Sequence, residues 1–197
     1  MLRRSALRGL GGLVALGVAI LGLGCSSIVS NRVYTHAELD LGAIKKVSVL
    51  PFDNYSSEPR AGERVTAAFH SELIALRLFD VVDPAQTEDF LARAKLNPQT
   101  MGVPELKKLR EALAVDAVVY GSADEYATQT VGTDTFPVVT LSVRLVDVQT
   151  GTVLWRDTVS GTGDPRIPIL GLGRIKTLQE MTQIVCNQIA KTLSGGK

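Results

Sequence analysis

The stretch VTLSVRLVDVQTGTVLWRDTVS, residues 139–160, decides the fold. In its first part, apolar residues alternate with polar ones, as in Val139-Thr140-Leu141-Ser142, which is the pattern of a strand with one buried face. Gln149-Thr150-Gly151 interrupts this alternation and supplies a glycine where a hairpin needs a left-handed backbone. Residues 152–160 then return as the partner strand, which contains Trp155. The stretch therefore predicts an antiparallel hairpin.

The register of this hairpin decides which side chains face one another. If Gln149-Thr150-Gly151 is a three-residue loop, Arg144 lies directly opposite Arg156. Like charges opposed on a sheet are unfavourable unless an anionic group shares them. A two-residue loop would instead place Arg144 opposite Asp157 and remove the repulsion.

Two interpretations of the arginine pair follow from the sequence. Asp124 or Glu125 on a neighbouring strand could compensate the charge, and this is the simpler interpretation. The alternative is that Arg144 and Arg156 bind the acidic surface of a partner. We therefore keep both arginines as candidate partner-binding residues.

The segments on either side of the hairpin predict a mixed α/β order. Short apolar runs predict strands at 47–52, 79–82 and 115–121, and residues 128–137 and 161–173 are expected to be loops. Apolar residues at helical spacing predict helices that begin near Pro59, Pro84, Pro104 and Ile175. We expect a single two-layer α/β sandwich over residues 44–197, with a mixed sheet that ends in an antiparallel hairpin and with a C-terminal helix.

The N-terminal segment has the pattern of a secretory signal. Residues 1–24 begin with arginines, continue as an uncharged apolar run and end in small residues before Cys25. The run is short for a transmembrane helix, which needs about 20 residues. A cysteine at this place resembles the lipobox of bacterial lipoproteins, in which the cysteine is lipidated and becomes the mature N-terminus. We expect residues 25–43 to be the lipidated cysteine and a flexible tether that ends on the domain surface near residues 39–41.

Composition argues against nucleic acid as a partner. Removal of residues 1–24 takes away three of the 21 basic residues and no acidic ones, which leaves 18 against 20. A chain with this balance has no electrostatic footprint for nucleic acid. Cys186 is the only cysteine besides Cys25, so lipidation of Cys25 leaves no intramolecular disulfide.

No set of residues in the sequence has the spacing of a catalytic, metal or cofactor site. His36 and His70 are the only histidines, and Gly171-Leu172-Gly173 does not follow a predicted strand. We therefore predict that the protein is not an enzyme and needs no cofactor. The loop at 161–173 is unusually apolar, and it either covers the core or docks on a partner or membrane. Its candidate contact residues are Ile167, Ile169, Leu170 and Leu172.

Four segments in this order resemble a known family: Val49–Asn54, Phe79–Asp83, Asp116–Ser122 and Leu145–Trp155. Together they resemble the periplasmic α/β domain of the curli-export lipoprotein (CsgG) family, a domain type that also occurs in LpoB and in the N-terminal domain of TolB. The resemblance spans roughly residues 45–193 and implies a non-enzymatic lipoprotein, anchored in the outer membrane and facing the periplasm. Ser26, in place of Asp after the lipidated cysteine, resembles the signal for transfer to that membrane.

The resemblance also implies the kind of partner. It predicts an accessory or assembly factor that binds other cell-envelope proteins. The alternatives are an LpoB-like activator of a peptidoglycan synthase and a subunit of a curli-like secretion assembly, which would be a homo-oligomer. The exporter has long insertions that span the membrane, whereas residues 128–137 and 161–173 are too short for this, so we predict no pore.

Overall fold

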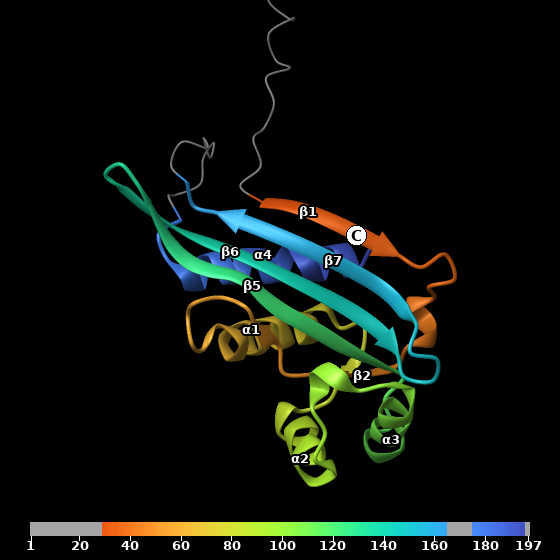
Figure 1. Cartoon of the computed structure of the whole chain (residues 1–197). Helices are drawn as coiled ribbons and strands as arrows, with labels where there is room; N and C mark the ends of the chain where they lie inside the picture. Colours follow the sequence, from red (N-terminus) through yellow and green to blue (C-terminus); the bar gives the residue numbers. More distant parts are fainter. Residues whose placement is uncertain (1–28, 165–174, 196–197) are drawn as a thin grey trace, which may run out of the picture.

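A mixed sheet with helices on both faces forms the molecule, and the computed structural model describes residues 29–164 and 175–195 of it (Figure 1). In chain order the elements of the described residues are β1 (Val29–Thr35), the 3-10 turn η1 (Leu41–Ala43), β2 (Lys46–Val49), β3 (Asp53–Asn54), α1 (Ala61–Leu76), β4 (Asp80–Val81), α2 (Pro84–Ala94), the 3-10 turn η2 (Pro98–Thr100), α3 (Val103–Leu113), β5 (Ala117–Val131), β6 (Asp134–Asp147), β7 (Val153–Thr162) and α4 (Leu178–Leu193).

The sheet has parallel and antiparallel parts. Its strand order is β1-β7-β6-β5-β2-β4, and β3 pairs with β5 beside β2. Strand β2 runs parallel to β4 and β5. Parallel neighbours need a long crossover connection, and here helix α1 lies between β2 and β4 while α2 and α3 lie between β4 and β5. Strands β5, β6, β7 and β1 are antiparallel neighbours. The predicted α/β sandwich with a mixed sheet and a C-terminal helix is confirmed.

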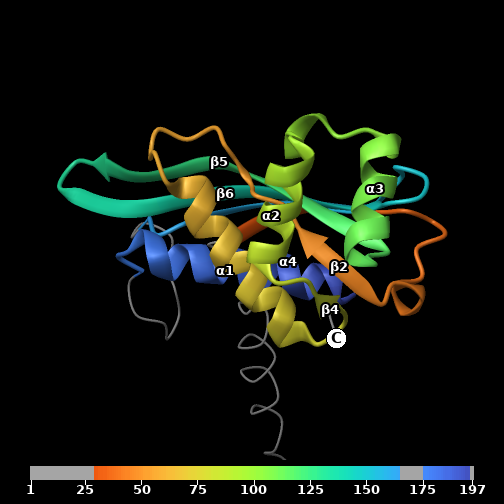
Figure 2. The ribbon, with the colours of Figure 1, turned by 90° about the horizontal axis from the view of Figure 1, so that it is seen from below.

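The helices cover the two faces of the sheet unequally. Helices α1 and α4 pack on one face, where residues such as Phe69, Leu141, Trp155 and Val185 form the main core and are at most 1% exposed. Helices α2 and α3 pack on the other face, only over the end of β5 and β6 near β2, around Leu109 and Val118. Figure 2 shows these two helix layers on opposite sides of the sheet. In the described part of the chain, no helix lies over the rest of the second face (Figure 1).

The predicted flexible tether is wrong for most of its length. Residues 29–35 form β1, an edge strand that pairs antiparallel with β7 over its whole length. Residues 41–43 form η1, and Leu39 and Leu41 pack against the main core. The ordered domain therefore includes at least residues 29–43 in addition to the predicted domain.

The predicted loop at residues 128–137 is also wrong. These residues belong to β5 and β6, which pair continuously until Val131 meets Asp134. The turn is only Gly132 and Thr133, and Gly132 has the positive φ of 64° that such a tight turn favours. The result is a long hairpin that extends past the neighbouring strands (Figure 1).

Helix starts differ slightly from the prediction. Asp83 caps α2 as expected, because its side chain accepts a hydrogen bond from the Ala85 amide at 2.8 Å and Pro84 opens the helix. Helix α1 begins at Ala61 rather than near Pro59, and α4 begins at Leu178, where the Thr177 hydroxyl accepts from the Glu180 amide. Within residues 29–164 and 175–195, no helix has the length and apolar character required to cross a membrane.

Candidate functional site

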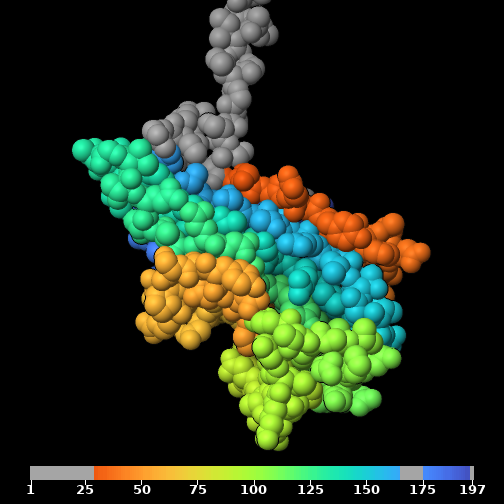
Figure 3. Space-filling view, viewed as in Figure 1, coloured from red at the N-terminus to blue at the C-terminus, as the bar shows by residue number. Residues whose placement is uncertain are grey.

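Among residues 29–164 and 175–195, no helix covers one face of strands β1, β7, β6 and β5 beyond the end near β2, and we call the side chains on this face the open face. In the space-filling view these strands are visible without a helix in front of them (Figure 3). Side chains alternate between the two faces along a strand, so the polar half of each strand lies here. On β6, Leu141, Val143 and Leu145 enter the core, whereas Ser142 and Arg144 point to the open face.

Cross-strand pairing arranges the open face in three rows that run from β1 to β5. The first row is Tyr34, Arg156, Arg144 and Tyr120. The second row is Arg32, Thr158, Ser142 and Ser122. The third row is Ser30, Ser160, Thr140 and Glu125. No residue in these rows is aliphatic, so the open face is hydroxyl-rich and carries three arginines.

Of the two registers that the sequence left open, the one that pairs Arg144 with Arg156 is observed, although the three-residue loop is not. The turn closes between Asp147 and Thr152, where the Asp147 amide donates to the Thr152 carbonyl at 3.0 Å. Leu154 is an extra residue, or β-bulge, in β7, because Val146 pairs with Val153 and Leu145 pairs with Trp155. The bulge restores the register and places the two arginines opposite each other.

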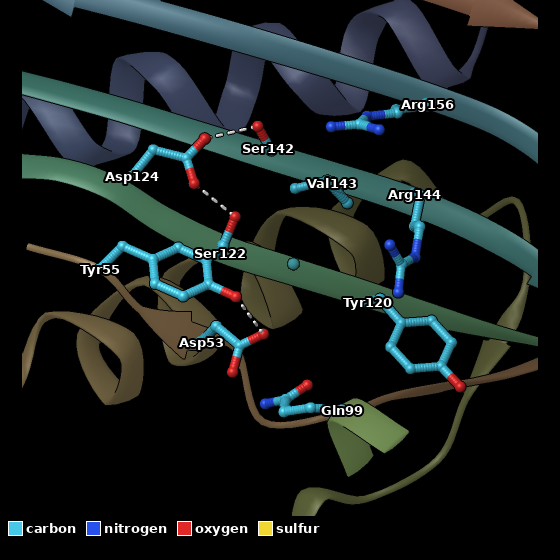
Figure 4. A pocket seen from close by; sticks show the side chains of 11 residues that line it. Asp53, Tyr55, Gln99, Tyr120, Ser122, Asp124, Ser142, Val143, Arg144 and Arg156 are labelled. Atoms are coloured by element: carbon cyan, nitrogen blue, oxygen red, sulfur yellow. Dashed lines mark hydrogen bonds between the residues drawn. The ribbon is translucent and has the colours of Figure 1, made fainter. Parts of the chain in front are cut away.

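A second bulge directs Asp124 onto the open face. The pairing of β5 with β6 shifts between Ala123 and Glu125, which leaves Asp124 as the extra residue. Its carboxylate accepts hydrogen bonds from the hydroxyls of Ser122 at 2.6 Å and Ser142 at 2.5 Å (Figure 4). Ser142 and Thr158 are also linked at 2.9 Å, so the hydroxyl row is connected to Asp124.

Neither acidic residue named in the sequence analysis pairs with the arginines. Asp124 is held by serine hydroxyls, and Glu125 accepts from the Gln129 side chain at 2.8 Å. The ion pairs between described residues join Arg64 to Glu58 and Arg93 to Asp89, all away from the open face. In the described residues, Asp124 and Glu125 therefore form no direct ion pair with Arg144 or Arg156.

A shallow hollow of about 260 Å³ lies between the arginines and the β3 segment (Figure 4). The guanidinium of Arg144 lies 4.7 Å from the centre of the Tyr120 ring, a cation–π contact that orients it. Burial raises the pKa of Tyr120, and the charge of Arg144 lowers it in part. On the opposite side, the Tyr55 hydroxyl donates to Asp53 at 3.3 Å, and the negative charge of Asp53 raises the pKa of Tyr55.

Other residues considered in the sequence analysis have structural environments. Cys186 is buried in the main core, and burial raises the pKa of its thiol to about 12, which makes it an unreactive thiol. His70 lies 3.2 Å from the Val82 carbonyl oxygen through Nε2. In the described part of the chain, no group of three His, Cys, Asp or Glu residues could hold a metal ion. Cys25, Ile167, Ile169, Leu170 and Leu172 lie outside the described residues.

Asp157 is a carboxylate on the opposite, covered face of β7. It is fully buried, and its Oδ2 accepts a hydrogen bond from the Thr192 hydroxyl of α4 at 2.6 Å. Burial raises the pKa of Asp157, and the hydrogen bond from Thr192 lowers it by a smaller amount. In the folded protein, Asp157 is therefore protonated at a higher pH than a solvated aspartate, whose pKa is 3.8.

This raised pKa predicts a pH dependence of stability. As the pH falls from 7 to 4, the folded state binds a proton at Asp157 before the unfolded state does. This titration therefore increases the free energy of unfolding as the pH falls. Asp157→Asn removes this titration. We expect wild type to gain stability relative to the variant over this pH range, measured by urea unfolding at each pH. A constant difference between the two proteins would contradict the raised pKa.

Several open-face residues had no signal in the sequence analysis. Tyr34 and Arg32 lie in the segment predicted to be a tether, so their place beside β7 was missed. Tyr55 reaches the hollow because its amide donates to the Ala123 carbonyl at 2.9 Å and continues the pairing of β3 with β5. The alternation in β6 and β7 did predict a polar face, but periodicity cannot show whether another layer covers it.

Solved structures with the same fold include a dodecameric protein, a lipoprotein and a hypothetical protein. The PelC dodecamer from Paraburkholderia phytofirmans is 20% identical, with a TM-score of 0.57 over 84% of this chain and 96% of that one. The lipoprotein GNA1162 from Neisseria meningitidis is 22% identical, with a TM-score of 0.53 over 75% of this chain and 99% of that one. The hypothetical protein CT253 from Chlamydia trachomatis is 12% identical, with a TM-score of 0.52 over 77% and 96%. Comparison with curated proteins gives no match.

The fold and the site together define a class: a mixed α/β domain in which helices cover one sheet face and only one end of the other, and the rest of that second face is polar and open among the described residues. The family model described as GNA1162-like, which is a family of lipoproteins, matches residues 34–194. The chain belongs to this family. Membership supports the lipoprotein prediction and a membrane-anchored location in the cell envelope, whereas it gives no support to the narrower resemblance to curli-export lipoproteins.

Proposed function

We propose that this protein is a lipid-anchored accessory or assembly factor that binds other cell-envelope proteins through its open face and is not an enzyme. The observation that carries the proposal is the uncovered half of the sheet, where three arginines and a row of hydroxyls face solvent. Membership in a lipoprotein family supports the anchor. Outer-membrane attachment facing the periplasm is part of this proposal and rests on Ser26 after Cys25.

The anchor is tested by the substitution Cys25→Ser. Because the thiol is the only group at this position that could receive the lipid, we expect the variant to leave the membrane fraction or to remain as an unprocessed precursor. Membrane fractionation and the mass of the mature chain are the measurements. A mature, membrane-bound variant would contradict an anchor at Cys25, and density separation of the two membranes decides whether wild type lies in the outer one.

The open face is tested by filling it. Thr158→Trp places a large ring in the middle of the second row, between Arg32 and Ser142. We expect recovery of partner proteins from detergent-solubilised envelopes to fall about tenfold or more, which corresponds to a loss of ~1.4 kcal/mol. The matched control is Lys108→Trp on the exposed side of α3, which should recover the same partners as wild type.

Three results of this capture experiment are informative. Loss with Thr158→Trp and not with Lys108→Trp supports the open face as the binding surface. If both variants recover as much partner as wild type does, the binding surface lies elsewhere on the protein. Failure of wild type to recover any specific envelope protein would remove the proposed function. If the recovered protein is a peptidoglycan synthase, the synthase activity with and without this protein decides whether it is an activator.

Self-association is a further part of the proposal. The similar PelC protein is a dodecamer, and in the described part of this chain no strand pairs with the outer edge of β1. An unpaired edge can accept a strand from another molecule. Light scattering of the full chain in detergent measures the mass of the assembly, and a monomer at all concentrations would remove this part.

A further inference from the structure

The two opposed arginines lack any acidic partner among the described residues. Arg144 and Arg156 are both exposed and directly paired across β6 and β7. Opposite residues on a sheet have Cβ atoms about 5 Å apart, so two positive charges in this place repel each other. The arrangement therefore has an electrostatic penalty that an anionic ligand would remove.

The nearby carboxylates are already engaged by hydroxyl groups. Asp124 accepts from Ser122 and Ser142, and Asp53 accepts from Tyr55. In Figure 4 the Asp124 carboxylate is directed toward the serines and the Arg144 side chain toward Tyr120. Neither carboxylate forms an ion pair with Arg144 or Arg156 among the described residues, so both guanidinium groups keep free N–H donors for a ligand.

The arginines are also presented in a defined way. Stacking of Arg144 on Tyr120 limits its rotamers, so less side-chain entropy is lost when a ligand binds. Tyr34 lies beside Arg156 at the other end of the row and is 50% exposed. Arg32, in the next row, extends the positive strip along β1. Planar guanidinium groups pair with carboxylates in a bidentate manner.

The size of the hollow limits the kind of ligand. Pockets that enclose small molecules have volumes of about 300–1,000 Å³ and bury most of the ligand. The hollow beside Arg144 is about 260 Å³ and open to solvent, on a flat sheet face. It could admit one or two side chains of a partner but not enclose a metabolite. The neighbouring hydroxyl rows would then contact the backbone or polar groups around those side chains.

We propose that the partner of the open face is a protein segment rich in Asp and Glu, whose carboxylates bind between Arg144 and Arg156. This inference rests on the proposed function and specifies its partner by charge. Charge complementarity is the argument, because the strip supplies three arginines that form no ion pair with an acid among the described residues. An anionic lipid surface is the competing ligand that the experiment must separate.

The test uses the full lipoprotein in uncharged detergent micelles and a fluorescent decaglutamate peptide, with decaglutamine as the neutral comparison. We expect wild type to bind decaglutamate only, with an affinity that falls as salt is raised. The double variant Arg144→Gln/Arg156→Gln should bind at least about tenfold more weakly, the loss expected for a charged hydrogen bond. The matched control Lys107→Gln/Lys108→Gln removes two exposed charges on α3 and should bind as wild type does.

Three outcomes would overturn the inference. The first is equal decaglutamate binding by wild type and the double arginine variant, with thermal unfolding confirming that both are folded. The second is binding of wild type to micelles that contain phosphatidylglycerol, lost in the double arginine variant, without any binding of decaglutamate, which would assign the strip to a lipid headgroup. Recovery of the same envelope partner by wild type and the double variant would remove the inference but keep the proposed function. Peptide binding without a recovered envelope protein would remove the proposed function alone.

Discussion

Replacement of Trp155 by Ala is expected to lower the free energy of unfolding by about 3–5 kcal/mol, the largest effect we predict for a single side chain. Trp155 is 1% exposed and lies in the main core between the sheet and helices α1 and α4. The bulge at Leu154 sets it opposite Leu145, so its removal would leave a cavity in the layer that joins the helices to β6 and β7. Urea unfolding of the full chain in detergent measures the change.

The neighbouring residue supplies the control. Arg156→Ala changes the next position along β7, whose side chain lies on the opposite, open face. It is expected to alter the free energy of unfolding by no more than about 0.5 kcal/mol, or to raise it slightly because the repulsion with Arg144 disappears. Equal losses in the two variants would contradict the assignment of the two faces.

Charge reversal at Arg156 is expected to separate stability from binding. Arg156→Glu places opposite charges across the β6–β7 pair, which should raise the free energy of unfolding by about 0.2–1 kcal/mol. The same change puts a carboxylate in the positive strip and should reduce the recovery of envelope partners at least about tenfold. Wild type would then be less stable than Arg156→Glu. This lower stability is the cost of an arginine pair that serves binding.

The hairpin could be predicted from the sequence because its signals are local. Alternation in residues 139–145 and Gly151 in the turn were sufficient to pair β6 with β7, and Gly151 has a φ of 74°. The register was right for a different reason than the one given. Four residues separate Asp147 from Thr152, and the extra residue Leu154 compensates the change in register. Nothing in the local sequence pattern marks this bulge.

The edge of the fold could not be predicted in the same way. Strand β1 is exposed along most of its length, so it has no apolar alternation, and its partner β7 lies more than 100 residues later. The tip of the β5–β6 hairpin is likewise exposed over residues 128–133 and looks like a loop by composition. Both segments are strands because long-range pairing satisfies their backbone hydrogen bonds.

The candidate site was predicted only in part. The sequence offered the Arg144–Arg156 pair as one of two possible registers, and the structure shows that this register occurs. It did not show that Asp124 is engaged by Ser122 and Ser142, because that depends on a bulge in β5. It also did not show that the polar face is uncovered, because that depends on where α2 and α3 end. These tertiary features turn an unfavourable charge pair into a candidate binding surface.

The most direct test of the open face as a charged binding surface is a parallel measurement on wild type and Arg156→Glu. For each protein, the recovery of partners from solubilised envelopes is measured together with the free energy of unfolding. We predict that the variant is at least as stable as wild type and recovers at least about tenfold less partner. Recovery equal to that of wild type by a folded variant would contradict this account.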